Sequence, residues 1–155
     1  MAATHQKFTE QDFHRKMAVD LFNLTWAFLD KPDRNALDED RMIHSAHASR
    51  YHWEVVGTNE NLAIGEWQIS RVYAVLKRAE PALFHSRRSL HICEQSGLTG
   101  FCLAYAHEAM ARALSLSGDQ AAAATSLKLA KEVAQTITEP EDKKLVLEDL
   151  KSIQV

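Results

Sequence analysis

The sequence predicts an all-α fold, a right-handed superhelix of about three helical hairpins with a capping helix at the C-terminus. Three observations lead to this prediction. Apolar residues recur at spacings of three and four, which place them on one face of a helix. The 155 residues include only three prolines and five glycines, too few for the turns of a β-sandwich or barrel. Finally, segments 41 residues apart carry similar residues. We expect one all-helical domain over residues 1–155.

The composition is that of an ordinary globular protein. The net charge is −3 and both signs are interspersed, so the chain shows no electrostatic footprint for nucleic acid. No run approaches the roughly 20 apolar residues of a membrane span. Residues 1–16 contain acids and no apolar core, unlike a signal peptide. The two cysteines, Cys93 and Cys102, suit free thiols in a reducing compartment, so we expect a cytoplasmic protein without a membrane or nucleic-acid partner.

The first hairpin is predicted to end at Gly57. Thr9 is suited to cap its first helix, which the proline at Pro32 stops. Asp38 is expected to cap the second helix, which runs from about residue 40 to 56. Gly57 then ends that helix in the C-terminal position that glycine favours.

The second hairpin spans residues 61–93 and breaks at Ala79-Glu80-Pro81, because proline removes a backbone donor and favours the first turn of a helix. The first of its two helices has one continuous apolar face. That face consists of Leu62, Ile69, Val72, Tyr73 and Leu76. The second helix carries small residues at Ala82, Ser86 and Ser89, which let two helix backbones approach closely.

The third hairpin and a last helix complete the chain. A fifth helix over residues 101–116 is apolar nearly all round, as expected of a helix with neighbours on several sides. Ser117-Gly-Asp-Gln120 is predicted to form a capping box that opens an alanine-rich sixth helix. Thr138-Glu-Pro-Glu141 is predicted to form a second box before the last helix. The apolar face of the last helix consists of Val146, Leu150 and Ile153.

A shift of 41 residues relates the hairpins to one another. A forward shift aligns Arg71 with Arg112 and Ala82 with Ala123. A backward shift aligns Trp67 with Trp26. The first, third and fifth helices therefore take equivalent positions, with the second, fourth and sixth as their partners.

Two motifs in this frame resemble the tetratricopeptide repeat, a helix-turn-helix unit that stacks into a right-handed curved array. Ile69-Ser70-x-x-Tyr73 stands where that family has Leu-Gly-x-x-Tyr. Ala82-x-x-x-Ser86-x-x-Ser89-Leu90 stands for Ala-x-x-x-Phe-x-x-Ala-Leu. The resemblance covers residues 61–137, and a longer period and Ser70 in place of glycine mark a divergent relative.

The resemblance implies that the first helix of each hairpin lines a concave groove. Within this chain, Trp67 and Arg71 are four residues apart and share a helical face, as do Glu108 and Arg112. The expected groove residues are Trp26, Trp67, Arg71, Tyr105, Glu108 and Arg112. Aromatic and arginine side chains suit an extended peptide or an anionic small ligand. The simpler alternative is that Glu108 and Arg112 form only an exposed ion pair.

Other candidate sites are weaker. His44 and His47 are three apart on a predicted helix, so both imidazoles can face one side as metal ligands. Spacing supplies no third ligand, and hydrogen bonding between packed helices is the simpler interpretation. The basic residues 77–78 and 87–88 are interrupted by acids and are expected to face water. Cys93 and Cys102 could approach across a turn, and we expect them to be buried and inert.

The expected function is that of a non-enzymatic binding module, without catalytic residues or a cofactor, which holds a protein, peptide or small anion in the groove. The main alternative is a metal- or ligand-dependent enzyme or sensor built around His44 and His47, helped by Glu66 or His107. A third interpretation is a homodimer whose groove is filled by the partner chain, because a short array exposes its terminal faces.

Overall fold

The computed structural model describes residues 7–155. Residues 1–16 are not expected to form a signal peptide, and the first six of them lie outside the described range. Within the described residues 82% are helical and none is in a strand. The helices are α1 (Glu10–Leu29), α2 (Ala36–Val56), α3 (Asn59–Val75), α4 (Ala79–Ser96), α5 (Gly100–Ser117), α6 (Gln120–Gln135) and α7 (Pro140–Lys151). None of these helices has the length and apolar character needed to cross a bilayer.

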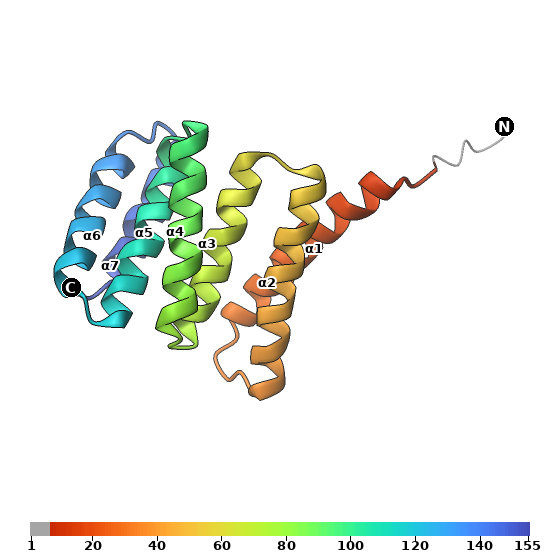
Figure 1. Cartoon of the computed structure of the whole chain (residues 1–155), viewed down its shortest axis with the longest axis horizontal. Helices are drawn as coiled ribbons and strands as arrows, with labels where there is room; N and C mark the ends of the chain where they lie inside the picture. The colour runs from red at the N-terminus through yellow and green to blue at the C-terminus, as the bar shows by residue number, and fades with distance from the viewer. Residues whose placement is uncertain (1–6) are drawn as a thin grey trace.

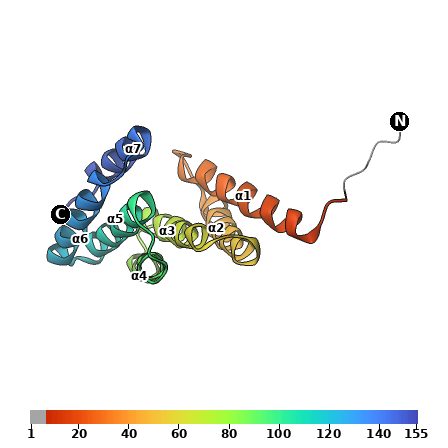
Figure 2. The same ribbon diagram turned by 90° about the horizontal axis from the view of Figure 1, so that it is seen from above.

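The helices stack as three consecutive hairpins, α1–α2, α3–α4 and α5–α6, followed by α7 (Figure 1). Seen from above, α1, α3 and α5 lie on one side of the stack, and α7 turns back onto that side next to α5 (Figure 2). The predicted all-α stack with a C-terminal helix is therefore confirmed. This arrangement places the odd-numbered helices on one face, the face that the sequence predicts to be the groove.

Capping boxes fix the start of the first three helices. Thr9, Asn35 and Thr58 each accept the backbone N–H of the third helical residue, whose side chain accepts the N–H of the cap in return. The predicted cap at Thr9 is confirmed. The prediction that Asp38 caps α2 is wrong, because Asp38 is the third residue of the helix and α2 begins at Ala36.

The two capping boxes predicted near the C-terminus are also wrong. α6 begins after Asp119, whose carboxylate accepts the Ala122 N–H at 3.1 Å. Ser117 instead donates its hydroxyl back to a carbonyl of α5. Glu139 precedes α7 without a side-chain cap, and Pro140 occupies the first turn. Serine, threonine and aspartate share the same capping chemistry, so the sequence pattern alone does not select among them.

Glycine ends three helices for two different reasons. Gly97 and Gly118 have φ of 63° and 91°, the left-handed conformation that favours glycine after a helix. Gly57 ends α2 as predicted, but in extended backbone with φ of −92°. There the missing side chain matters, because a Cβ on Gly57 would lie 2.7 Å from the Trp53 carbonyl oxygen.

Small residues allow close contact between the two helices of the second hairpin, α3 and α4. Ser70 Oγ donates to the Ala82 carbonyl at 2.8 Å, and Ser89 Oγ donates to the Ala63 carbonyl at the same distance. Both hydroxyls thus form hydrogen bonds with backbone carbonyls of the neighbouring helix, as buried polar groups generally do. The predicted small-residue contact is confirmed, since Ala82, Ser86 and Ser89 are at most 1% exposed.

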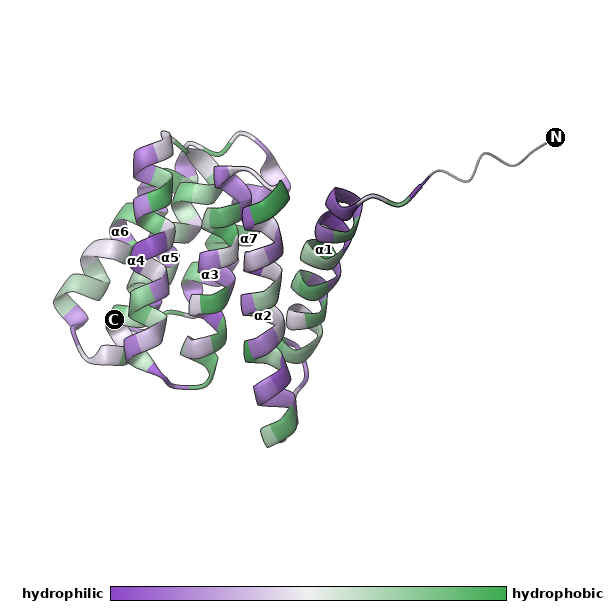
Figure 3. Cartoon of the chain, turned by 45° about the vertical axis from the view of Figure 1, so that its right-hand side comes forward, coloured by the Kyte–Doolittle hydropathy of each residue, from purple (hydrophilic) through white to green (hydrophobic). Residues whose placement is uncertain are grey.

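Hydrophobic residues of every helix from α1 to α7 contribute to the core clusters, and Figure 3 shows the hydropathy of each residue along the ribbon. The largest core cluster joins α3, α5, α6 and α7, and its aliphatic part near the C-terminus includes Val146, Leu150 and Ile153. All three are at most 8% exposed, which confirms the predicted apolar face, although Ile153 lies just beyond the end of α7. The C-terminal helix is thus held to the groove side of the stack by its own buried residues.

The close contact between α5 and α6 gives a test of the packing. Ala130 of α6 is 0% exposed, so an Ala130→Leu change should overpack the core and lower the free energy of unfolding by about 1–3 kcal/mol. Ala124→Leu on the exposed face of the same helix is the matched control and should be close to neutral. Urea denaturation measures both, and equal stabilities for the two variants would contradict the packing described here.

Candidate functional site

The six predicted groove residues lie together, and we call them the groove cluster: Trp26, Trp67, Arg71, Tyr105, Glu108 and Arg112. Their aromatic rings form a row across three helices. The Trp26 and Trp67 ring centroids are 5.6 Å apart, and those of Trp67 and Tyr105 are 4.7 Å apart. Trp67 and Tyr105 are 6% and 1% exposed, so these two rings form the floor of the face rather than an open stacking surface.

The Glu108 carboxylate is the centre of the groove cluster. Its Oε2 accepts the indole N–H of Trp67 at 2.8 Å. Its Oε1 accepts from Arg71 Nη1 at 2.8 Å and from Arg112 Nε at 2.7 Å. Glu108 is 0% exposed, and a buried charge is tolerated only when it is paired and hydrogen-bonded in this way. The expected pair with Arg112 exists, but it is buried rather than exposed on the helix surface.

α7 extends this network from the other end of the sequence. Asp149 accepts the Tyr105 hydroxyl at 2.7 Å and an N–H of Arg71 at 3.4 Å. Arg112 donates to Ser152 Oγ at 2.9 Å. Burial and the hydrogen bond to Asp149 raise the pKa of Tyr105, so its hydroxyl remains a donor. Sequence reasoning missed Asp149, which lies outside the repeat and 78 positions from Arg71.

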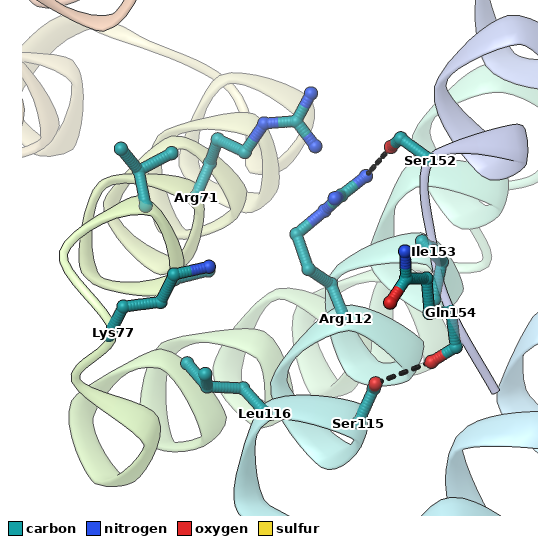
Figure 4. A pocket seen from close by; sticks show the side chains of 10 residues that line it. Arg71, Lys77, Arg112, Ser115, Leu116, Ser152, Ile153 and Gln154 are labelled. Atoms are coloured by element: carbon teal, nitrogen blue, oxygen red, sulfur yellow. Dashed lines mark hydrogen bonds between the residues drawn. The ribbon is translucent and has the colours of Figure 1, made fainter.

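Beside the groove cluster is a cavity of about 340 Å³, which we call the cationic pocket (Figure 4). It lies between the turn that ends α3, the last part of α5 and the segment after α7. Its polar lining residues are Arg71, Lys77, Arg112, Ser115, Ser152 and Gln154, and four apolar residues complete it. The lining therefore holds three cationic side chains and no acidic one. Lys77 forms no ion pair within residues 7–155.

A second buried carboxylate, Glu66, joins α2, α3 and α4. It is 2% exposed and accepts from Arg50 Nε and Arg88 Nε, each at 3.0 Å. His85 Nδ1 lies 2.7 Å from its other oxygen. Burial alone would raise the pKa of Glu66, but the His85 hydrogen bond and the two arginine charges outweigh burial and lower it. Gly65 makes room for this network, because a Cβ there would lie 2.8 Å from Arg50 Cδ.

The predicted histidine pair lies beside this network. His47 Nε2 is 3.0 Å from the Tyr73 hydroxyl, and its ring centroid is 5.3 Å from that of His85. Burial and the nearby His85 lower the pKa of His47, which favours the neutral ring. His44 is exposed. No group of three or more His, Cys, Asp or Glu side chains between residues 7 and 155 is arranged to hold a metal ion.

His107, the other expected helper, lies apart from the Glu66 network. It is half-buried in α5, and no hydrogen bond joins it to Glu66 in the described part of the chain. Burial lowers the pKa of His107. The side chains that surround Glu66 come instead from α2 and α4, which the repeat shift does not indicate.

Cys93 and Cys102 meet across the α4–α5 turn. Their sulfur atoms are 3.4 Å apart, and the residues are 0% and 4% exposed. The contact with Cys93, together with burial, raises the pKa of the Cys102 thiol. Both residues belong to a core cluster with Ala63 and Ala106. The pair is therefore packed as part of the hydrophobic core.

Comparison with known proteins gave no match for this chain: none was found among protein-family models, curated proteins or solved structures.

Glu108 gives a direct test of the groove cluster. The Glu108→Gln change keeps the shape of the side chain but removes the charge shared by Arg71 and Arg112. Because it leaves two largely buried arginines without this partner, we expect the free energy of unfolding to fall by about 3–5 kcal/mol. Glu148→Gln, at a side chain 59% exposed, removes the same charge and should be nearly neutral. Similar urea midpoints for the two variants would contradict the central role of Glu108.

Three histidines with lowered pKa values predict a pH dependence of stability. The pKa values of His47, His52 and His107 all lie below the ordinary value of 6.5. Below pH 6.5 the unfolded chain therefore binds protons that the folded chain does not, so stability is full above pH 6.5 and falls as pH decreases through this range. Urea unfolding at pH 7 and pH 5.5 measures this loss of stability. The His107→Gln change should make the difference in stability between the two pH values smaller, and an unchanged difference would exclude His107 as a contributor.

Proposed function

We propose that this protein is a non-enzymatic binding module that holds an acidic segment of a partner protein against the groove face. On this proposal the stack is a divergent relative of the tetratricopeptide repeat, with α1, α3 and α5 as its groove-lining helices. The cationic pocket carries the proposal, because three cationic and no acidic side chains line it. A cytoplasmic location fits this role, since both cysteines are free thiols.

The charges around the pocket support an anionic ligand. Arg71 and Arg112 are balanced by Glu108 and Asp149, which leaves the charge of Lys77 without a counterpart among the described side chains. The side chains of Arg71 and Arg112 are still 15% and 20% exposed. An incoming carboxylate can therefore accept charge-assisted hydrogen bonds from groups that are already in place.

The fixed position of these groups also favours binding. Arg71 donates to both Glu108 and Asp149, and Arg112 donates to both Glu108 and Ser152. Side chains held in this way lose little conformational entropy when a ligand binds. The entropic cost of ordering them therefore offsets less of the favourable binding free energy.

A peptide array of graded charge tests the proposal. The array should select acidic sequences, and the same peptides with Asp and Glu replaced by Asn and Gln should lose affinity. Binding should weaken as ionic strength rises, because exposed charges are screened. In an NMR titration, the amide shifts should cluster in α3, α5 and residues 152–155. Absence of any preference for acidic peptides, or shifts confined to α2 and α4, would contradict the proposal.

A pair of charge-matched variants locates the site. Ser115→Glu places a negative charge in the lining of the cationic pocket and should weaken binding of a selected acidic peptide about tenfold. Arg87→Gln changes the net charge by the same amount on the exposed face of α4, outside the groove, and should leave the affinity unchanged. Thermal melts check that both variants are folded. Equal losses for the two variants would indicate a non-specific charge effect.

A further inference from the structure

The backbone at Lys77 distinguishes the cationic pocket from the rest of the stack. Lys77 has φ of 60°, and among residues 7–155 it is the one non-glycine residue with positive φ. Side chains other than glycine rarely adopt this conformation, because Cβ comes too close to the backbone. The turn itself does not need a lysine, since the bonds that close it come from the backbone.

The repeat shows which residue this position would otherwise favour. The 41-residue shift lays Lys77 on Gly118, and the two turns are closed by the same pair of bonds. Lys77 N–H donates to the carbonyl three residues earlier at 3.1 Å, as Gly118 N–H does. The next N–H donates to the carbonyl five residues earlier, at 2.9 Å in one turn and 3.1 Å in the other. The turn after α3 therefore has a lysine in a left-handed conformation for which the turns after α4 and α5 have glycine.

Backbone strain of this kind is concentrated at binding and active sites, so the conformation of Lys77 points to a functional role for this position. The Lys77 ammonium group extends toward the cationic pocket, where Arg112 and Gln154 lie on the opposite side (Figure 4). Arg71 approaches from above in the same view. The donors thus come from three elements, and in this view they border the cavity from different sides.

We infer that the cationic pocket binds a phosphoryl group, an inference that rests on the proposed function of the groove. A phosphoryl group presents three acceptor oxygens and carries about −1.5 to −2 charges at neutral pH, whereas a carboxylate presents two oxygens in one plane. Donors spread around a cavity match the three oxygens better. The volume of about 340 Å³ also leaves room for part of the group that carries the phosphoryl, either a phosphorylated side chain of the partner segment or a small phosphorylated molecule.

Substitutions at Lys77 separate binding from folding. Lys77→Gly removes the charge and relieves the backbone, so it should raise the melting temperature by about 2–4 °C while weakening phosphate binding at least tenfold. Lys77→Arg keeps the charge and should bind phosphate within about threefold of the parent. Lys131→Gln, which removes a lysine charge from the exposed face of α6, is the control for net charge. Isothermal titration with inorganic phosphate gives the affinities, and thermal melts in phosphate-free buffer give the stabilities.

The source of the phosphoryl group is tested with one acidic peptide chosen from the array and synthesised with phosphoserine, glutamate or serine at one position. Preferential binding of the phosphoserine form indicates a phosphorylated partner, and binding of inorganic phosphate with no preference among the peptides indicates a small molecule. Either result supports the inference if the Lys77→Gly change abolishes the binding observed. Undiminished phosphate binding by Lys77→Gly would overturn the inference.

Failure of the inference can be told apart from failure of the proposed function. Binding of acidic peptides without any binding of phosphate or phosphoserine would overturn the inference and leave the groove function standing. Absence of binding by every probe would overturn both.

Discussion

The burial of one carboxylate, Glu108, constrains the groove side of this protein. A charge removed from water is stable only with close and well-oriented partners, and Glu108 obtains three: Trp67, Arg71 and Arg112. Two of these come from α3 and the third from α5 itself. Neither helix can shift along the other without leaving a buried charge short of partners. Asp149 adds α7 to the same network by accepting from Arg71 and Tyr105. The register of three helices thus follows from a few polar contacts.

This constraint has a consequence for the charge of the groove face. The two arginines and the two acids of the network balance one another, so the network forms a rigid and nearly neutral floor. Lys77, at the edge, keeps a charge that no described carboxylate balances. The binding surface proposed here would combine preorganised donors with one cation available to a ligand. The Glu66 network plays a similar structural part between α2, α3 and α4. A cavity beside it is also lined by cationic and no acidic side chains, but all of its lining residues come from α4, so it lies outside the groove cluster.

Local patterns in the sequence were enough to predict the order of the helices and the six residues of the groove cluster. The 3–4 spacing and caps such as Thr9 act over one or two turns. The repeat shift then placed Arg71 and Arg112 on one face. The caps of α2, α6 and α7 were mispredicted, because several polar residues near each start have the same capping chemistry. Ile153 was assigned to the last helix, and it is buried although the helix has already ended.

Contacts outside the repeat were beyond sequence reasoning. Asp149 reaches Arg71 only because α7 turns back onto the groove side, and no spacing rule connects positions 78 apart. Arg50 and His85 reach Glu66 from two different helices. Lys77 is an intermediate case. The 41-residue shift aligns it with Gly118, so a lysine at the position of a C-terminal glycine is a signal that the sequence contains.

Hydrogen exchange of the native protein, followed residue by residue by NMR, tests the central claim most directly. If Glu108 and Asp149 unite α3, α5 and α7, the most protected amides of these helices should open together with one free energy, close to that of global unfolding. α1, at the end of the stack and outside this network, should open at lower free energy. Exchange of α7 at a much lower free energy than α3 and α5 would contradict the account, because α7 would then not be held by the network.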